Sequence, residues 1–152
     1  MSLIIATGSN LGDSLSLLDE AKEILSGKFQ LIAASRIYRS AAVDYEDQPD
    51  FFNQVLEFAL PAFTPQQVMN ELLQIEQAMG RTRELWRGPR TLDLDIIFWG
   101  TQTICTEQLV IPHPRWHERS FVVFPLQELP FFQTIKKCST IPESFQITAS
   151  PL

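Results

Sequence analysis

The sequence predicts an α+β fold, and three observations lead to that prediction. Apolar and polar residues alternate at 51–60 and 92–99, which is the period-two pattern of β-strands. Apolar residues recur every three or four positions at 17–25 and 68–79, which is typical of amphipathic helices. The segments follow in the order strand, helix, strand, strand, helix, strand, which favours a sheet covered by helices.

The first half of the chain begins with a short apolar run. Residues 3–7 predict a buried strand, and residues 8–13 predict the turn that leads into a helix. We expect Gly27 to end this helix and a second strand to occupy residues 31–39, before a polar loop at 40–50. The apolar stripe of the helix consists of Leu17, Leu18, Ala21, Ile24 and Leu25.

The strands predicted at 51–60 and 92–99 each have two different faces. The first carries Phe51, Asn53 and Glu57 on its odd face, and we expect that face to be available for a ligand. The second strand carries Asp93 and Asp95 opposite an apolar face. The apolar faces consist of Phe52, Leu56, Phe58 and Leu60 in the first strand and of Leu92, Leu94, Ile96 and Phe98 in the second.

Residues 64–79 have the signals of a helix at both ends. Thr64, Pro65 and Gln67 are typical of an N-cap, a first-turn proline and a capping box. Gly80 is well placed to end the helix, and we expect Glu76 on its solvated flank. The buried stripe is predicted to be Val68, Leu72, Ile75 and Met79.

This order of elements describes a ferredoxin-like βαββαβ sandwich, in which both helices cover one face of the sheet and the opposite face is left open. Beyond Gly100 we expect a short hairpin, a proline-containing loop, a short helix near 121–129 and an irregular tail. A length of 152 residues is typical of one domain, so we expect residues 1–152 to form a single domain and a monomer.

The chain is acidic overall but locally basic. Its net charge is −6, so non-specific binding to a phosphate backbone lacks its usual driving force, and we expect no nucleic-acid partner. Four arginines, Arg81, Arg83, Arg87 and Arg90, lie within ten residues, which favours a small anionic ligand. No apolar run approaches the ~20 residues of a membrane-spanning helix, and we find no signal peptide. We therefore expect a cytoplasmic protein without a membrane partner.

Two aspartates in the last predicted strand point to a metal site. Asp93 and Asp95 are two positions apart, so their carboxylates should lie on the same side at a separation of roughly 7 Å, close enough to share one or two hard cations. An ordinary solvated strand face is the alternative. Arg87 and Arg90 stand directly before the strand and favour the metal site. Carboxylates that hold Mg²⁺ and arginines that hold phosphate oxygens are recurring parts of phosphoryl-transfer sites.

Aromatic and polar residues elsewhere are candidates for ligand binding. His113 lies between two prolines, which limit its backbone freedom, so its ring could either donate to a phosphate or be fixed for packing. Arg119 and Phe121 follow it and offer a second cation and an aromatic face. Phe51 could form the other half of a stacking pair for a flat heterocycle, with Asn53 reading the polar ring edge.

Residues 87–97, RGPRTLDLDII, resemble the signature of the 6-hydroxymethyl-7,8-dihydropterin pyrophosphokinases, folate-pathway enzymes that move a diphosphate from ATP to a pterin alcohol. The resemblance extends over about residues 3–128, and further segments follow in the order of that family. Trp86 stands where the family usually has a basic residue. It could be a lid residue or a core residue, and we favour the lid because its neighbours Arg83, Glu84 and Arg87 are charged. The further segments are TGSNLG at 7–12, YRS at 38–40, DQPDFFN at 47–53, Glu76 with Gly80 and Arg81, and PHP at 112–114.

The resemblance implies a role for each candidate residue. Asp93 and Asp95 would bind two Mg²⁺ ions that bridge the triphosphate of ATP, the co-substrate. The implied catalytic residues are Arg81, Arg90 and Asp95. The implied contacts of ATP are Arg81, Arg83, Arg87, Arg90, His113 and Arg119. The implied contacts of the pterin are Ser40, Val43, Phe51, Asn53, Asp95 and Phe121, with the two phenylalanines on either side of the ring.

Two other interpretations remain open at this point. A ferredoxin-like binding module could use the open sheet face for RNA or for a regulatory small molecule, although the acidic net charge opposes RNA. The chain could also be a catalytically degenerate pterin- or nucleotide-binding relative with the same fold.

Overall fold

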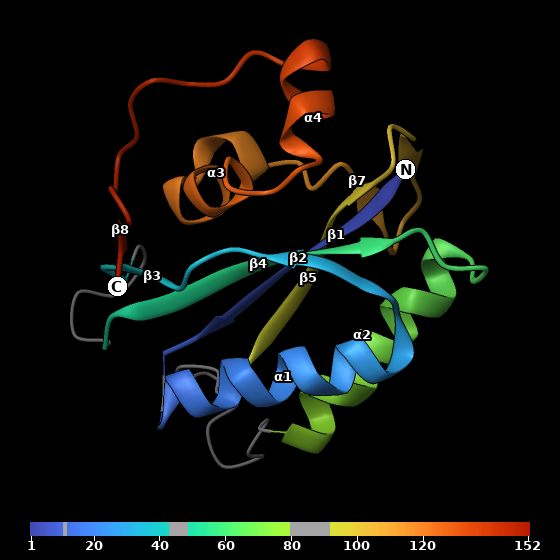
Figure 1. The fold of residues 1–152 in the computed structure, drawn as a ribbon, viewed down its shortest axis with the longest axis horizontal. Helices are drawn as coiled ribbons and strands as arrows, with labels where there is room; N and C mark the ends of the chain where they lie inside the picture. The colour runs from blue at the N-terminus through green and yellow to red at the C-terminus, as the bar shows by residue number, and fades with distance from the viewer. Residues whose placement is uncertain (11, 43–48, 80–91) are drawn as a thin grey trace.

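The fold is an antiparallel β-sheet with helices on both of its faces (Figure 1). We describe it from a computed structural model, which covers residues 1–10, 12–42, 49–79 and 92–152. Within these residues the sheet consists of β1 (Ser2–Ser9), β2 (Leu31–Ala34), β3 (Tyr38–Ser40), β4 (Phe51–Ala59), β5 (Asp93–Trp99) and β8 (Ser150–Pro151). The strand order is β5, β1, β4, β3, β8, and β2 also pairs with β4. This architecture is compatible with the predicted α+β class.

Helix α1 (Ser14–Lys28) begins at a capping side chain and runs past the glycine expected to end it. Asp13 is the N-cap and accepts a hydrogen bond from the backbone N–H of Ser16 at 3.2 Å. Gly27 lies inside the last turn, so the prediction that it ends the helix is wrong by one residue. The helix ends where Phe29 takes an extended conformation (φ −130°, ψ 154°) and buries its ring in the core.

Helix α2 (Pro65–Met79) has the predicted capping box. The N–H of Gln67 donates to Thr64 Oγ1 at 3.2 Å, and the N–H of Thr64 donates back to Gln67 Oε1 at 2.8 Å. The predicted stripe residues Val68, Leu72 and Ile75 are buried. Local sequence signals were therefore sufficient to predict this helix.

The single strand predicted at 31–39 is wrong, because it is divided into β2 and β3. Ser35 lies at the break and replaces the regular strand pairing with side-chain hydrogen bonds. Its hydroxyl accepts from the N–H of Val55 at 3.0 Å, and its carbonyl accepts from the Gln54 side chain at 2.7 Å. The N–H of Val55 in β4 and the carbonyl of Ser35 are thus satisfied without a continuous partner strand.

The main core lies between the sheet and the helices α1 and α2, on what we call the α1 face of the sheet (Figure 1). Leu3 and Ile5 of β1, Leu56 and Phe58 of β4, and Leu94 of β5 contribute the sheet side of this core. The helix side comes from the predicted stripes, including Leu18, Ala21, Leu25, Val68 and Leu72. Alternation along the strands therefore directs one set of side chains to these helices.

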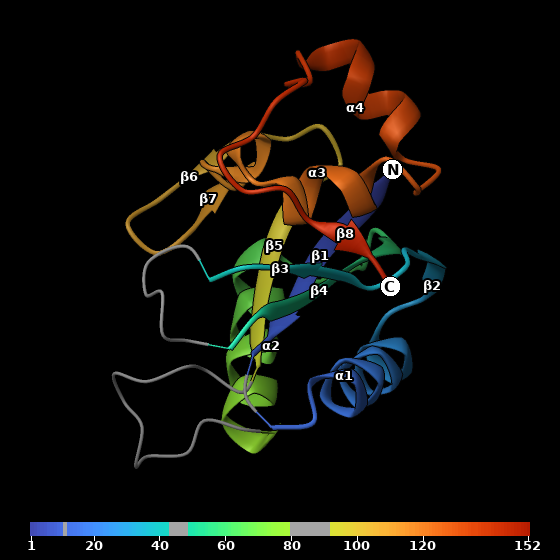
Figure 2. The ribbon, with the colours of Figure 1, turned by 90° about the vertical axis from the view of Figure 1, so that its left-hand side faces the viewer.

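The opposite face, here called the α3 face, was expected to be open, and that expectation is wrong for part of it. Helices α3 (Ser120–Leu126) and α4 (Phe132–Cys138) lie over it, as Figures 1 and 2 show. Ile4, Val55 and Ile97 point to this face and form a second core with these helices. Apolar residues on both faces of the strands require a cover on both sides.

Phe98 belongs to this second core and not to the first, contrary to the prediction. Its ring lies edge-on to Trp116, with 5.1 Å between ring centroids, and 6.4 Å from the ring of Phe131. The pairing of β1 with β5 shifts register between Ile4 and Ile5, which inserts one extra residue into β5. This bulge turns Phe98 toward the α3 face.

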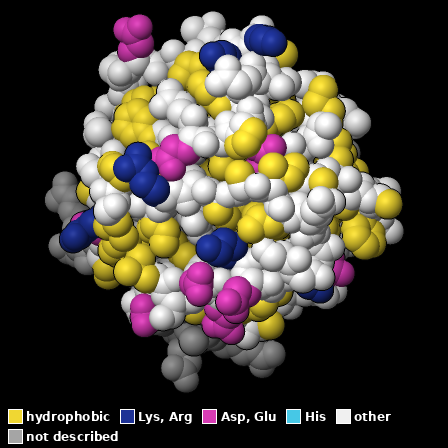
Figure 3. Space-filling model, in the orientation of Figure 1, with side chains coloured by type: hydrophobic (Ala, Val, Ile, Leu, Met, Phe, Trp, Pro, Cys, Tyr) yellow, Lys and Arg dark blue, Asp and Glu magenta, His cyan; other side chains and the backbone are white. Residues whose placement is uncertain are grey.

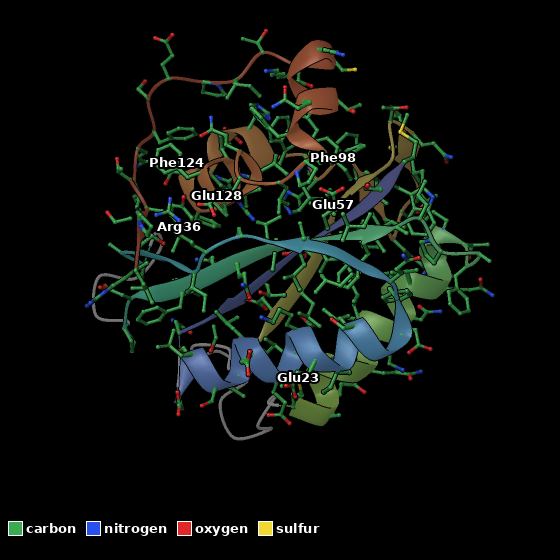
Figure 4. All side chains as sticks on the ribbon, viewed as in Figure 1. Glu23, Arg36, Glu57, Phe98, Phe124 and Glu128 are labelled. Carbon is green, nitrogen blue, oxygen red and sulfur yellow. The ribbon has the colours of Figure 1, made fainter. Side chains whose placement is uncertain are left out.

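Glu57 also lies under this cover, so it is not part of an open ligand face (Figure 4). Its side chain is 3% exposed. Oε2 accepts from the Ser2 hydroxyl at 2.8 Å, and Oε1 accepts from the N–H of Phe131 at 2.9 Å. Both carboxylate oxygens are hydrogen-bonded, so Glu57 joins the first strand to the start of α4.

The C-terminal part contains the expected hairpin, β6 (Ile104–Cys105) and β7 (Val110–Ile111), followed by the 3₁₀ helix η2 (Trp116–Glu118). The helix expected near 121–129 is present as α3. The expectation of an irregular tail is wrong, because α4 packs on the second core and β8 pairs with β3. Among the described residues, no helix is both long enough and apolar enough to cross a membrane.

Candidate functional site

A pocket of about 650 Å³ opens on the α3 face of the sheet, beside the N-terminal end of α3. Within the described residues, its lining comes from the strands with Ala41 and Ala42 after β3, from the segment 115–122 and from the segment 142–147. Seven of the predicted site residues line it, namely Ser40, Phe51, Asn53, Asp93, Asp95, Arg119 and Phe121. The structure thus brings together candidates that are far apart in the sequence.

Two neighbouring rows of residues run across the floor of the pocket. In the first row, Gly8 of β1 stands between Asn53 of β4 and Asp93 of β5. In the second, Ala6 stands beside Asp95. Because Gly8 and Ala6 have the smallest side chains, they leave space above β1 next to both carboxylates. Two carboxylates on one side of a strand, with open space beside them, fit a site for hard divalent cations.

Asn53 has an amide group that is free to bind a ligand. Its side chain is 9% exposed, and its Nδ2 atom has no hydrogen-bond partner in the described part of the chain. A buried donor without a partner is costly, so it is expected to meet an acceptor when the pocket is filled. Gly8 is required here, because a Cβ at that position would lie 2.6 Å from Asn53 Oδ1.

Phe51 and Phe121 bring aromatic rings to the same pocket from β4 and α3. Both are half-buried, and Ser40, which pairs with Phe51 across β3 and β4, is buried. The guanidinium carbon of Arg119 lies 5.6 Å from the centroid of the Phe121 ring. The pocket therefore combines apolar surface for a flat ring with a nearby cation.

His113 lies near the pocket, but among the described residues it is not part of the wall. Burial lowers the pKa of His113 below its usual value, Arg119 and Arg115 act in the same direction, and Asp95 opposes them. Its Nδ1 accepts from the backbone N–H of Arg115 at 3.2 Å. The neutral ring therefore carries its proton on Nε2, which is available as a donor.

Glu76 was expected on a solvated flank of α2, and this is wrong. Its side chain is 4% exposed, and its Oε2 accepts from the backbone N–H of Leu94 at 2.8 Å. Leu94 stands between Asp93 and Asp95 in β5. Glu76 thus fixes the backbone from which both aspartates project.

Several predicted site residues lie outside the described residues. These are Val43, Arg81, Arg83, Arg87 and Arg90, together with the expected lid residue Trp86.

The pocket also contains residues that the sequence did not suggest. One group, Arg115, His117 and Glu118, lies in the segment before α3, and a second group comes from the C-terminal tail. The second group consists of Pro142, Ser144, Phe145, Gln146 and Ile147. Apolar residues alternate weakly at Phe145 and Ile147, which was the local signal that one side of this part of the tail is partly buried.

A family model and single relatives of this chain all point to the same family. The family model described as 7,8-dihydro-6-hydroxymethylpterin-pyrophosphokinase (HPPK) matches residues 4–130. A 2-amino-4-hydroxy-6-hydroxymethyldihydropteridine pyrophosphokinase of Bacillus subtilis is 41% identical over 144 residues, which cover 93% of this chain and 84% of that protein. A protein of the same name from Haemophilus influenzae is 39% identical, with 82% of this chain and 79% of that protein covered.

A longer relative is the folic acid synthesis protein fol1 of Pneumocystis carinii. It is 40% identical over 129 residues, which are 84% of this chain but only 17% of that protein. The family match and the similarity to single relatives over most of their length show that the chain belongs to the 7,8-dihydro-6-hydroxymethylpterin-pyrophosphokinase family.

Proposed function

We propose that the pocket on the α3 face is the site at which the chain acts as a pyrophosphokinase. Pyrophosphoryl transfer from ATP to hydroxymethyldihydropterin, a step of folate synthesis, is the activity of this chain as a member of its family. The observation that supports this site most directly is the convergence of Asn53, two aromatic rings and two aspartates on one cavity. Asn53 and the aromatic rings suit a flat polar heterocycle, and the two aspartates suit a metal-bound triphosphate, which are the two substrates of the reaction.

The pterin is proposed to lie between Phe51 and Phe121. Its ring would stack on the two aromatic faces, and the free Nδ2 donor of Asn53 would bind an acceptor on the ring edge. Ser40 lines the same part of the pocket and is a further candidate for contact with the ring edge. Val43 remains a proposed contact outside the described residues.

Asp93 and Asp95 are proposed to hold two Mg²⁺ ions. Their position on one side of β5, beside the small residues Gly8 and Ala6, supports this proposal. Bound Mg²⁺ would neutralise the negative charge that develops on the phosphoryl oxygens. Asp95 would also lie close to the hydroxymethyl group of the pterin, where the reaction takes place.

ATP is proposed to contact His113 and Arg119 through its phosphates. The proton on His113 Nε2 and the guanidinium of Arg119 are suitable donors for phosphate oxygens. In the reaction the alcohol oxygen attacks the β-phosphorus and gives up its proton, the bond from that phosphorus to the oxygen shared with the α-phosphate breaks, and AMP leaves. Arg81, Arg83, Arg87 and Arg90 are proposed to complete the phosphate site.

We further propose that residues 1–152 form one ferredoxin-like domain that works as a cytoplasmic monomer on small molecules. The order β5, β1, β4 and then β2 or β3, with α1 and α2 on one face, supports the ferredoxin-like description. The net charge of −6 disfavours nucleic acid as a partner. Figure 3 shows acidic side chains gathered over α1, with a basic side chain beside them.

The decisive experiment supplies ATP, Mg²⁺ and 6-hydroxymethyl-7,8-dihydropterin to the purified chain and separates the nucleotide products. We expect AMP and the pterin diphosphate in equal amounts. Release of ADP in place of AMP would indicate ordinary phosphoryl transfer and contradict the proposal. Binding of the pterin without any nucleotide product would identify the chain as a catalytically degenerate relative.

A further inference from the structure

The C-terminal tail returns to the substrate pocket after α4. Figures 1 and 2 show it passing along α3 and ending in β8, beside β3. On the way, residues 142–147 supply five of the residues that line the pocket. This segment lies beyond residues 4–130, which are the part of the chain that the family model matches.

The tail is attached to the fold within this segment and again after it. Within it, the Phe145 ring packs edge-on against Phe124 of α3, with 5.3 Å between centroids. After it, Ser150 pairs with Arg39 in β3, and the N–H of Leu152 donates to the carbonyl of Ile37 at 3.0 Å. The tail therefore connects α3 to the strand that carries Ser40.

Ser120 makes the attachment between these two points. Its side chain is 1% exposed and lies in the pocket wall. Its hydroxyl donates to the carbonyl of Ile147 and accepts from the N–H of Ala149 at 2.9 Å. One hydroxyl thus binds two backbone groups of the tail, and it stands between the candidate ligand residues Arg119 and Phe121.

We propose that residues 142–147 form a wall of the pterin half of the pocket and that Ser120 is the positioning residue that holds this wall in place. The inference rests on the proposed function of the pocket. It favours the pterin half because the tail is fixed to β3, whose Ser40 pairs with Phe51, and to α3 beside Phe121. A wall that joins β3 to α3 would cover the edge of a pterin ring bound between Phe51 and Phe121. The wall would then exclude water from the polar edge of that ring.

The test compares Ser120→Ala with a matched control, Ser35→Ala. Ser35 is also a buried serine whose hydroxyl donates to a carbonyl and accepts from a backbone N–H, but it does not line the pocket. For both variants we would measure kcat, the KM of the pterin, the KM of ATP and the hydrogen exchange of the Ala149 amide. Phe145→Ala is a second variant, which loosens the tail without changing Ser120.

For Ser120→Ala we expect faster exchange at Ala149 and a pterin KM raised about tenfold, as follows from the loss of ordered hydrogen bonds at the rim. The KM of ATP should stay within about twofold of wild type, because only the pterin half loses its wall. Ser35→Ala should leave both KM values unchanged. If Ser120→Ala does not fold, the same measurements on Phe145→Ala decide the question.

An unchanged pterin KM, despite faster exchange at Ala149, would overturn the inference, and so would an equal rise in both KM values. Unchanged exchange at Ala149 would show that Ser120 does not hold the tail. A wild-type chain that neither binds the pterin nor releases AMP would instead refute the proposed function, so the two failures can be told apart.

Discussion

Replacing Gly8 by alanine tests the geometry of the pocket floor. The new Cβ would lie 2.6 Å from Oδ1 of Asn53, whereas ordinary van der Waals contact begins at 3.4 Å. The carboxamide of Asn53 must therefore move by about 0.8 Å or rotate away. The next contacts of the new methyl group, Cγ of Asn53 at 3.7 Å and the carbonyl oxygen of Phe52 at 3.8 Å, are ordinary ones. The conflict is thus confined to the side chain of Asn53.

We expect the Gly8→Ala change to weaken pterin binding far more than it changes stability. Loss of one hydrogen bond from Asn53 Nδ2 to the ring is worth about 1–2 kcal/mol, which is roughly a 5- to 30-fold rise in the pterin Kd. The free energy of unfolding should change by less than about 1 kcal/mol, because only the end of a side chain has to move.

Calorimetric titration with the pterin, in the presence of a non-hydrolysable ATP analogue, measures the first quantity, and urea unfolding measures the second. Gly27→Ala is the matched control, since a Cβ at Gly27 meets nothing within 4 Å. It should leave pterin affinity unchanged and raise stability by up to about 1 kcal/mol through helix propensity. Equal pterin affinity in Gly8→Ala and wild type would refute the assignment of Asn53 to the ring edge.

Three further predictions concern single carboxylates. Asp95→Asn should reduce AMP release by at least about a hundredfold without lowering the melting temperature, because it removes a charge from the metal site but leaves the core intact. Asp19→Asn, an exposed position on α1, is its control, and wild-type turnover in Asp95→Asn would contradict the metal role. Glu76→Ala should lower the free energy of unfolding by about 1–3 kcal/mol, because the Leu94 N–H loses its buried acceptor. Urea unfolding measures this loss, and unchanged stability would argue against it. Burial opposes ionisation of Glu128, but hydrogen bonds from the backbone N–H of Arg36, the Tyr38 hydroxyl and the Arg36 side chain outweigh it and lower the pKa of the carboxyl. The carboxylate therefore contributes stability above its ordinary pKa, and this contribution is lost as the pH falls through the lowered value. Glu128→Gln should thus be less stable than wild type near neutral pH, by about 1 kcal/mol, and the difference should shrink in acid. A difference that stays constant with pH in urea unfolding would disprove this account.

The cluster around Glu128 lies at the junction of α3 and β3 (Figure 4). The backbone N–H of Arg36 donates to its Oε1 at 2.9 Å, and the Tyr38 hydroxyl donates to Oε2. Arg36 N–Hε also donates to Oε2 at 3.2 Å. The pH effect predicted above is therefore a property of the contact between the sheet and its C-terminal cover.

Local patterns were enough to predict the elements whose causes are local. The capping box at Thr64 and Gln67, the two faces of β4 and the faces of β5 as far as Ile96 depend on residues close together in the chain. The shared position of Asn53, Asp93 and Asp95 follows from these faces together with the strand order. That part of the candidate site was accessible from the sequence.

Features that depend on contacts between residues far apart in the chain could not be predicted from the sequence. Val55 is an apolar residue on the odd face of β4, so a cover on that face was implied, but nothing local identifies α3 and α4 as the cover. The local sequence gives Glu76 the position of a surface residue, and only the folded structure shows that it accepts a hydrogen bond from the N–H of Leu94. The tail has almost no periodicity, and contacts with distant residues, among them its hydrogen bonds to Ser120, the Phe145–Phe124 ring contact and the pairing of β8 with β3, bring it to the pocket.

The two-sided packing of the sheet has a consequence for the entropy of ligand binding. Asn53, Asp93 and Asp95 stand on strands that also bury apolar side chains on the α1 face, Leu56, Leu94 and Ile96 among them. The backbone freedom of the pocket floor is therefore lost during folding and not when a ligand arrives. Binding then has to order only side chains, at about 0.5–1.5 kcal/mol for each one that becomes fixed.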